Sequence, residues 1–154
     1  METTSLERLA QLHPKVRDKA IDAYTEAVKV TPVGVHPFID QTMRSFAQSD
    51  ELYSKGRTTK GPIVTNAKAG QSYHNYGLAL DFHIQINGKD SWVVDHNWMV
   101  VVNVFKAHGF VWGGDFKSIL DQPHFEMTFG HNWRDLLAKH NAKDFIPGTT
   151  FVNI

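Results

Sequence analysis

The sequence predicts an α+β fold in which helices flank a small antiparallel sheet. Residues 78–86 alternate in the manner of a strand, and Asn87-Gly88 follows, a dipeptide typical of tight turns between antiparallel strands. Helical periodicity occurs in separate segments that do not alternate with strands as βαβ units. With 154 residues, 42% of them hydrophobic, the chain suits one folded domain and is too short for two. We therefore predict a single domain over residues 1–154.

Two helices are expected in the first thirty residues. Thr4 with Glu7 has the spacing of a capping box for a short helix through Leu12. Pro14 suits the first turn of the second helix, which Thr31-Pro32 should end. The expected apolar stripe of this helix consists of Val16, Ala20, Tyr24, Ala27 and Val28.

Capping signals mark two more helices. Ser45 with Gln48 forms a second capping box, and Gly56 should end the helix that it opens. Asp95 can cap another helix, which Gly109 should end. The apolar stripe of this fourth helix consists of Trp98, Val101, Val102 and Phe105.

The strands are expected in the middle and the later part of the chain. In residues 78–86, one face carries Leu78, Leu80, Phe82, Ile84 and Ile86. The opposite face carries Ala79, Asp81, His83 and Gln85. Residues 91–94 should return as the second strand of a hairpin. A short strand over residues 123–127 then precedes a last helix over 132–140.

Composition excludes several classes of function. Lys+Arg and Asp+Glu number 16 each, so the chain lacks the basic excess that captures nucleic acids or anionic membranes. The absence of Cys excludes disulfides, thiolate metal sites and cysteine nucleophiles. The longest apolar run, residues 99–102, is too short to span a bilayer. What stands out is a supply of nine His.

Three of the polar side chains could bind one metal ion. His74 follows a long polar loop over residues 57–73, while Asp81 and His124 lie on the predicted strands. A loop of that length in a small domain is usually functional or mobile. Two neutral imidazoles and a carboxylate would leave one coordination position open, as catalytic zinc requires. The spacing alone does not establish such a site, because ordinary polar histidines and a buried acid would look the same.

Two ordered motifs carry a family resemblance. Residues 72–81 have the form S-x-H-x-x-G-x-A-x-D, and residues 121–126 contain an acid-x-x-His pattern. Together they resemble the zinc-binding signature of the LAS metallopeptidases. This group comprises D-Ala-D-Ala carboxypeptidases and L-Ala-D-Glu endopeptidases that cut bacterial peptidoglycan. The resemblance implies a fold like that of hedgehog and D-Ala-D-Ala peptidases.

Further segments resemble one branch of this group. Arg44-Ser45, residues 52–58 and residues 63–67 are similar to the L-alanyl-D-glutamate peptidases, which include CwlK-like cell-wall enzymes and phage endolysins. The resemblance extends over roughly residues 5–140, nearly the whole chain. We therefore expect no separate cell-wall-binding module.

The resemblance implies a role for each matching position. The implied zinc ligands are His74, Asp81 and His124. Asp121 falls on the general base, and Arg44 falls on the substrate-facing cation that stabilises the oxyanion. Thr42-Met43 departs from the Gly-Tyr that many relatives carry before this arginine. The base is Asp rather than the Glu common in D-Ala-D-Ala dipeptidases, which favours an L-Ala-D-Glu endopeptidase.

Several polar residues allow more than one interpretation. Asp121 could be a turn residue, which would make Glu126 the rival base; Glu126 could equally hydrogen-bond a ligand imidazole. His83 could be an unusual ligand or a neighbour of the site. Arg44 could be only an ion-pair partner, and Arg57 is a weaker candidate for substrate binding. The remaining histidines, expected at the surface or at helix caps, are His13, His36, His96, His108, His131 and His140.

The resemblance thus implies a monomeric zinc endopeptidase that hydrolyses the L-Ala-D-Glu bond of peptidoglycan stem peptides. No nucleic acid or membrane partner is expected. Residues 1–7 lack a secretory signal, so we expect synthesis in the cytoplasm and holin-type release to the cell wall, as for a phage endolysin. The alternatives are a D-Ala-D-Ala carboxypeptidase and a non-catalytic domain that binds cell wall or stores zinc.

Overall fold

The computed structural model describes residues 1–154 and is built around a five-stranded sheet. The strands run in the order β1-β2-β5-β4, with β3 paired to β2, and every pairing is antiparallel. The strand bounds are β1 Val35–Gln41, β2 Ala79–Ile86, β3 Lys89–Ser91, β4 Val111–Trp112 and β5 His124–Glu126. The predicted α+β class with a small antiparallel sheet is confirmed.

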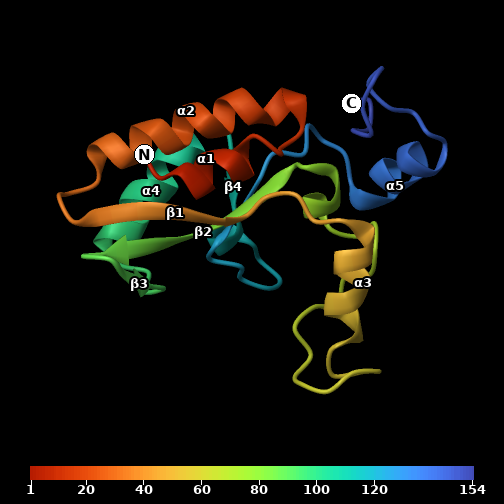
Figure 1. The fold of residues 1–154 in the computed structure, drawn as a ribbon, viewed down its shortest axis with the longest axis horizontal. Coiled ribbons are helices and arrows are strands. Elements are labelled where there is room, and N and C mark those ends of the chain that lie inside the picture. The colour runs from red at the N-terminus through yellow and green to blue at the C-terminus, as the bar shows by residue number, and fades with distance from the viewer.

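The helices cover one face of this sheet. Figure 1 shows α1 and α2 lying on one side of β1 and β2, while α3 and the loop after it extend away from one end. α4 passes behind the strands in this view and packs against α2, and its Trp98 contacts Phe82 of β2. No helix lies on the opposite face of β2 in this view. The helix bounds are α1 Thr3–Leu9, α2 Pro14–Val30, α3 Phe46–Ser54, α4 His96–Ala107 and α5 Trp133–Asn141, with 3₁₀ turns η1 Tyr73–Tyr76 and η2 Gly113–Asp115. None of the helices is both long enough and apolar enough to cross a membrane.

The hydrophobic core lies between the sheet and the covering helices. The predicted alternation of β2 is confirmed, because Leu80, Phe82 and Ile84 are buried on the helix-covered face. Phe125 of β5 packs between Phe82 and Phe105, with ring centroids 5.1 and 4.6 Å apart. Fully burying each such side chain stabilises the fold by about 1.5–3 kcal/mol. The core therefore fixes β2 and β5 side by side.

Local capping signals gave mixed results. The capping box of Ser45 and Gln48 forms as predicted, and Asp95 accepts a hydrogen bond from the backbone N–H of Trp98. The expected box of Thr4 and Glu7 is wrong. Glu2 caps α1 instead, because its carboxylate accepts hydrogen bonds from two free N–H groups of the first turn. The helix ends at Leu9 and does not reach residue 12.

The strand predictions were incomplete. Neither β1 nor β4 was predicted; β1 is an edge strand that contains Pro37, which cannot donate to the ladder and interrupts the pattern. The predicted two-residue turn is present, with Asn87 and Gly88 at φ 50° and 79°. Pairing resumes directly after it, at Ile86 with Lys89, so the return strand is residues 89–91 and not 91–94.

Candidate metal centre

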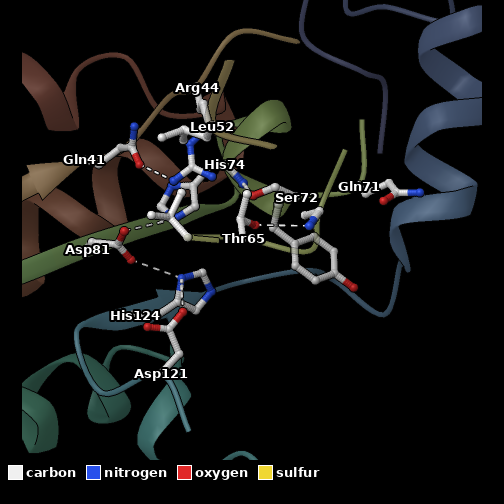
Figure 2. Close-up of a pocket in the computed structure, with 13 residues that line it drawn as sticks. Gln41, Arg44, Leu52, Thr65, Gln71, Ser72, His74, Asp81, Asp121 and His124 are labelled. Atoms are coloured by element: carbon white, nitrogen blue, oxygen red, sulfur yellow. Dashed lines mark hydrogen bonds and ion pairs between the residues drawn. The ribbon is translucent and has the colours of Figure 1, made fainter. Parts of the chain in front are cut away.

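The three predicted metal ligands come together from three different elements. His74 lies on η1, Asp81 on β2 and His124 on β5, and the antiparallel register places Asp81 directly opposite His124. Potential ligand atoms of the three side chains all lie within 4.8 Å of one another. Figure 2 shows Asp81 between the two imidazoles. The sequence motifs thus converge on one place in the fold.

The first motif folds as a capped turn that orients His74. The Ser72 hydroxyl accepts a hydrogen bond from the His74 backbone N–H, and Gly77 ends the turn at φ 68°. A Cβ on Gly77 would also lie 2.6 Å from the backbone nitrogen of His13, so only glycine fits. His74 Nδ1 lies 2.9 Å from the Thr42 carbonyl, to which it donates. Its Nε2 is therefore directed at Asp81 Oδ2, at 3.3 Å.

His124 is held by carboxylates on both sides of its ring. Its Nδ1 lies 3.1 Å from Asp81 Oδ1, and its Nε2 lies 3.0 Å from Glu126 Oε2. Burial opposes protonation, but these contacts outweigh it and raise the pKa of His124 to about 9. Burial likewise opposes ionisation of Asp81, yet hydrogen bonds from His124 and His74 hold its pKa well below the usual range. Of the two interpretations of Glu126, the geometry favours orientation of the imidazole.

Asp121 lies at the edge of this cluster, with Oδ2 3.8 Å from His124 Nδ1 and a side chain that is 53% exposed. Its backbone N–H donates to the carbonyl of Gly113 at 3.0 Å. A Cβ on Gly113 would lie 2.1 Å from the Asp121 carbonyl oxygen, so any other residue there would displace the acid. Desolvation raises the pKa of Asp121; His124 opposes this shift, and the nearby charge of Asp81 adds to it.

Arg44 is half-buried on the opposite wall of the site. One of its terminal nitrogens donates to Gln41, and its Nε–H is buried without a protein acceptor. Burial lowers the pKa of Arg44, whereas the carboxylates of Asp81 and Asp121 oppose that shift. Arg44 also lines the cleft, where its guanidinium could contact a ligand. This arrangement differs from a simple surface ion pair, since no carboxylate contacts the group.

Asn75 is a site residue that the sequence reasoning missed. Its Oδ1 accepts hydrogen bonds from the backbone N–H groups of Gly70 and Ser72, and its Nδ2 donates to the Arg44 carbonyl at 3.0 Å and to Ser49 Oγ at 2.8 Å. This buried amide ties the segment of Arg44 to the turn that carries the first histidine. Its place three residues after Ser72 is a capping-box spacing that could have identified it.

A cleft of about 550 Å³ opens over these residues. The loop over residues 57–73 supplies much of its wall, through Val64, Thr65, Ala67, Gln71, Ser72 and Tyr73. Arg57 does not line the cleft. Its guanidinium donates to the carbonyls of Tyr53 and Thr65 and to Asn66, and it lies over the Tyr53 ring at 3.8 Å. Arg57 thus braces this loop, and the structure does not support the expected substrate contact.

The other histidines lie outside the cluster. His83 bonds Asp40 through Nδ1 and Asp90 through Nε2, so it is not a ligand of the same site. His13 caps α2 as expected, because its Nδ1 accepts a hydrogen bond from Lys15 N–H at 3.1 Å. Unlike a surface residue, however, it is fully buried beneath the C-terminal segment.

These pKa shifts predict how pH affects the metal-free protein. His124 has a raised pKa, so its stabilisation is complete below pH 6.5 and is lost as the pH rises toward about 9. Asp81 has a lowered pKa, so its stabilisation is present above pH 3.8 and is lost in stronger acid. We therefore expect the Tm of EDTA-treated protein, measured by circular dichroism, to fall between pH 6.5 and 9.

The matched control is His124→Gln, which removes the titrating group. The difference in Tm between the wild type and this variant should shrink as the pH rises over that interval. A difference that stays constant or grows with pH would contradict the proposed ion-pair geometry.

Comparisons with known proteins identify the family. Residues 65–127 match the peptidase M15 family model described as D-alanyl-D-alanine carboxypeptidase. The chain is 43% identical over 129 residues to the peptidoglycan L-alanyl-D-glutamate endopeptidase CwlK of Bacillus subtilis (strain 168), covering 77% of this chain and 74% of that protein. The crystal structure of the Serratia marcescens L-Ala D-Glu endopeptidase ChiX matches with a TM-score of 0.60 at 23% identity, covering 85% and 88% of the two chains. The 43% identity to CwlK and the match to the family model show that this chain belongs to the peptidase M15 family of metallopeptidases.

Proposed function

We propose that this chain hydrolyses the L-Ala-D-Glu bond of peptidoglycan stem peptides with a zinc ion held by His74, Asp81 and His124. The observation that carries the proposal is the convergence of these three side chains in a cleft that also contains Asp121 and Arg44. The 43% identity to an L-alanyl-D-glutamate endopeptidase supports the choice of bond.

The donor set fits zinc in its catalytic form. Two imidazoles and one carboxylate leave a coordination position for water or substrate. The outward nitrogens of the two rings are already engaged, by the Thr42 carbonyl and by Glu126, as is typical of metal-binding histidines. When bound, zinc lowers the pKa of a water ligand to roughly 7 and polarises a carbonyl.

We infer that Asp121 acts as the general base. It is exposed to the cleft and adjacent to His124, so it can take a proton from the attacking water and pass it to the departing D-Glu amine. The bond between the L-Ala carbonyl carbon and that nitrogen breaks, and the water oxygen remains on L-Ala.

We infer that Arg44 stabilises the negative charge that develops during hydrolysis. Its guanidinium, which lines the cleft, can donate to the oxyanion that forms on the L-Ala carbonyl, an interaction typically worth about 3–4 kcal/mol. A cation in this wall also suits the D-Glu residue, whose α-carboxylate is free because the stem peptide continues through the γ-carboxyl group.

The role of Glu126 can be separated from that of Asp121 with Glu126→Gln. Loss of the negative charge behind His124 should weaken zinc binding about 10–100-fold, because a neutral amide oxygen is a weaker acceptor for the imidazole N–H than a carboxylate. At saturating zinc the hydrolytic rate should largely return. Chelator competition measures the zinc affinity, and the turbidity of a cell-wall suspension measures the hydrolytic rate. A rate that stays at least 100-fold low in saturating zinc would instead make Glu126 the base.

We also propose that residues 1–154 act as a single catalytic domain and as a monomer. Resemblance to the branch that includes phage endolysins supports a role in host lysis after holin-type release. The purified protein should then lyse host cells whose inner membrane has been permeabilised, and its mass in solution should be that of one chain.

The bond is identified by mass spectrometry of digested peptidoglycan. The proposal expects fragments with a new D-Glu amino terminus. Release of free D-Ala with the L-Ala-D-Glu bond intact would instead support the carboxypeptidase activity in the family description. Stoichiometric zinc binding without hydrolysis would support the binding domain.

A further inference from the structure

The helix-free face of the sheet carries an ordered aromatic cluster beside the metal centre. Asp81 and His83 are two residues apart on β2, so both lie on this face of the sheet, roughly 7 Å from each other. On the neighbouring strand, Phe38 pairs with His83 in the register of β1 and β2. The cluster therefore begins one side chain away from the proposed ligand Asp81.

Carboxylates from both adjacent strands fix the His83 ring. Nδ1 lies 2.8 and 3.0 Å from the two oxygens of Asp40, and Nε2 lies 3.0 Å from Asp90 Oδ1. The imidazole is 4% exposed and is packed near Phe38, with the ring centroids 5.1 Å apart. Both ring nitrogens have partners, so the imidazole is held in one orientation and forms a rigid surface against which another ring can pack.

Trp92 packs against the His83 imidazole, and much of its own surface remains exposed to solvent. Its ring centroid is 4.9 Å from that of His83 at an interplanar angle of 30°, yet the residue remains 54% exposed. One face of the indole is thus supported, and the other is open. Beside it, Asp90 binds His83 and Gln85 through the same oxygen, Oδ1, and more than half of its side chain is exposed. A fixed aromatic plane next to an exposed acceptor suits a ring that carries hydroxyl groups.

The proposed substrate carries a sugar ring whose distance from the scissile carbonyl is close to the distance between Asp81 and His83. In peptidoglycan the L-Ala nitrogen is acylated by the lactyl group of N-acetylmuramic acid. The sugar ring is therefore joined six bonds from the scissile carbonyl carbon, or roughly 7 Å when the link is extended. The spacing from Asp81 to His83 is similar, and Trp92 lies beside His83, because it directly follows Ser91, which pairs with Ile84 in the register of β2 and β3.

We propose that Trp92, supported by His83, is a subsite for the N-acetylmuramic acid ring, with Asp90 accepting a hydrogen bond from the sugar. The subsite rests on the proposed endopeptidase function and deepens it. The enzyme then recognises stem peptides that are still attached to the glycan, in preference to free peptides.

The first test compares two substrates that differ only in the sugar. These are an N-acetylmuramoyl stem peptide and the same peptide with an N-acetyl group in its place. The wild type should show a kcat/KM roughly three- to tenfold higher for the muramoyl substrate, as expected for one aromatic contact. Trp92→Ala should bring this ratio close to one, and Trp92→Phe should keep an intermediate ratio.

A matched control is Phe129→Ala, which removes another exposed aromatic ring. Phe129 contacts Lys15 and Lys19 of α2, on the helix-covered side of the sheet, and should leave the ratio unchanged. A wild-type ratio near one, or an unchanged ratio in Trp92→Ala, would overturn the subsite.

A binding measurement separates this inference from the proposed function. N-acetylmuramoyl-L-alanine, which contains no L-Ala-D-Glu bond, is titrated by calorimetry against N-acetyl-L-alanine as the reference ligand. Tighter binding of the muramoyl compound that is lost in Trp92→Ala supports the subsite even if the protein cleaves no L-Ala-D-Glu bond. Cleavage of that bond with equal binding of the two ligands would overturn the subsite and leave the endopeptidase function in place.

Discussion

Asp121→Asn is expected to lower the rate of peptidoglycan hydrolysis by about 10²–10⁴-fold, the range typical of losing a general base. The amide has almost the shape of the carboxylate but cannot accept the proton of the attacking water. Because Asp121 lies beyond the three proposed ligands, zinc should remain bound at one ion per chain. Turbidity of a cell-wall suspension measures the rate, and elemental analysis of dialysed protein measures the metal.

Asp115→Asn is the control for this experiment. Asp115, the last residue of η2, is also an exposed acid, but it pairs with Lys106 on the surface at 2.7 Å, an interaction of small energetic value. Its replacement should leave the rate within about twofold. If Asp121→Asn kept both its zinc and the full lytic rate, Asp121 would not be the base, and Glu126 would be examined next.

Asp81→Ala is expected to abolish both zinc binding and hydrolysis. Asp81 is the one carboxylate that contacts both imidazoles, at 3.3 Å from His74 and 3.1 Å from His124. Its loss removes a ligand as well as the negative charge that balances the cation. Zinc affinity should therefore fall by more than the 10–100-fold that an outer hydrogen-bond partner is worth. Chelator competition and elemental analysis measure this loss.

The control for this experiment is Asp22→Ala, at an exposed position on α2, which should bind zinc with the affinity of the wild type. Near-ultraviolet circular dichroism of both variants shows whether the aromatic core remains packed. A folded Asp81→Ala variant that still bound one zinc ion with unchanged affinity would place the metal elsewhere.

Among the features that the sequence predicted, the most reliable were those made by neighbouring residues. Ser45 and Asp95 each cap a helix through a hydrogen bond three residues ahead, and Asn87-Gly88 forms its turn with both φ angles positive. The turn of the first metal motif is equally local, since the hydroxyl of Ser72 and the φ of Gly77 define it. Such contacts depend on few residues and can be inferred without the rest of the fold.

Contacts between distant segments could not be inferred in this way. The pairing of β1 with β2 joins segments about 40 residues apart, and it places Asp40 against His83. A contact within one loop can be missed for the same reason: Arg57 was a candidate for substrate binding, but its guanidinium donates to the carbonyl of Thr65 and braces the loop. Both ends of such contacts must be positioned before either side chain has an identifiable partner.

The sequence by itself determined the class of the fold and the types of side chain that can bind the metal. Only the tertiary structure decided that His124 directs Nδ1 toward Asp81 and Nε2 toward Glu126, and that the helix-free face of the sheet continues from this cluster to Trp92. The physical reason is that residue types limit what chemistry is available, whereas the direction of each lone pair and each N–H is set by the strands and turns packed around it.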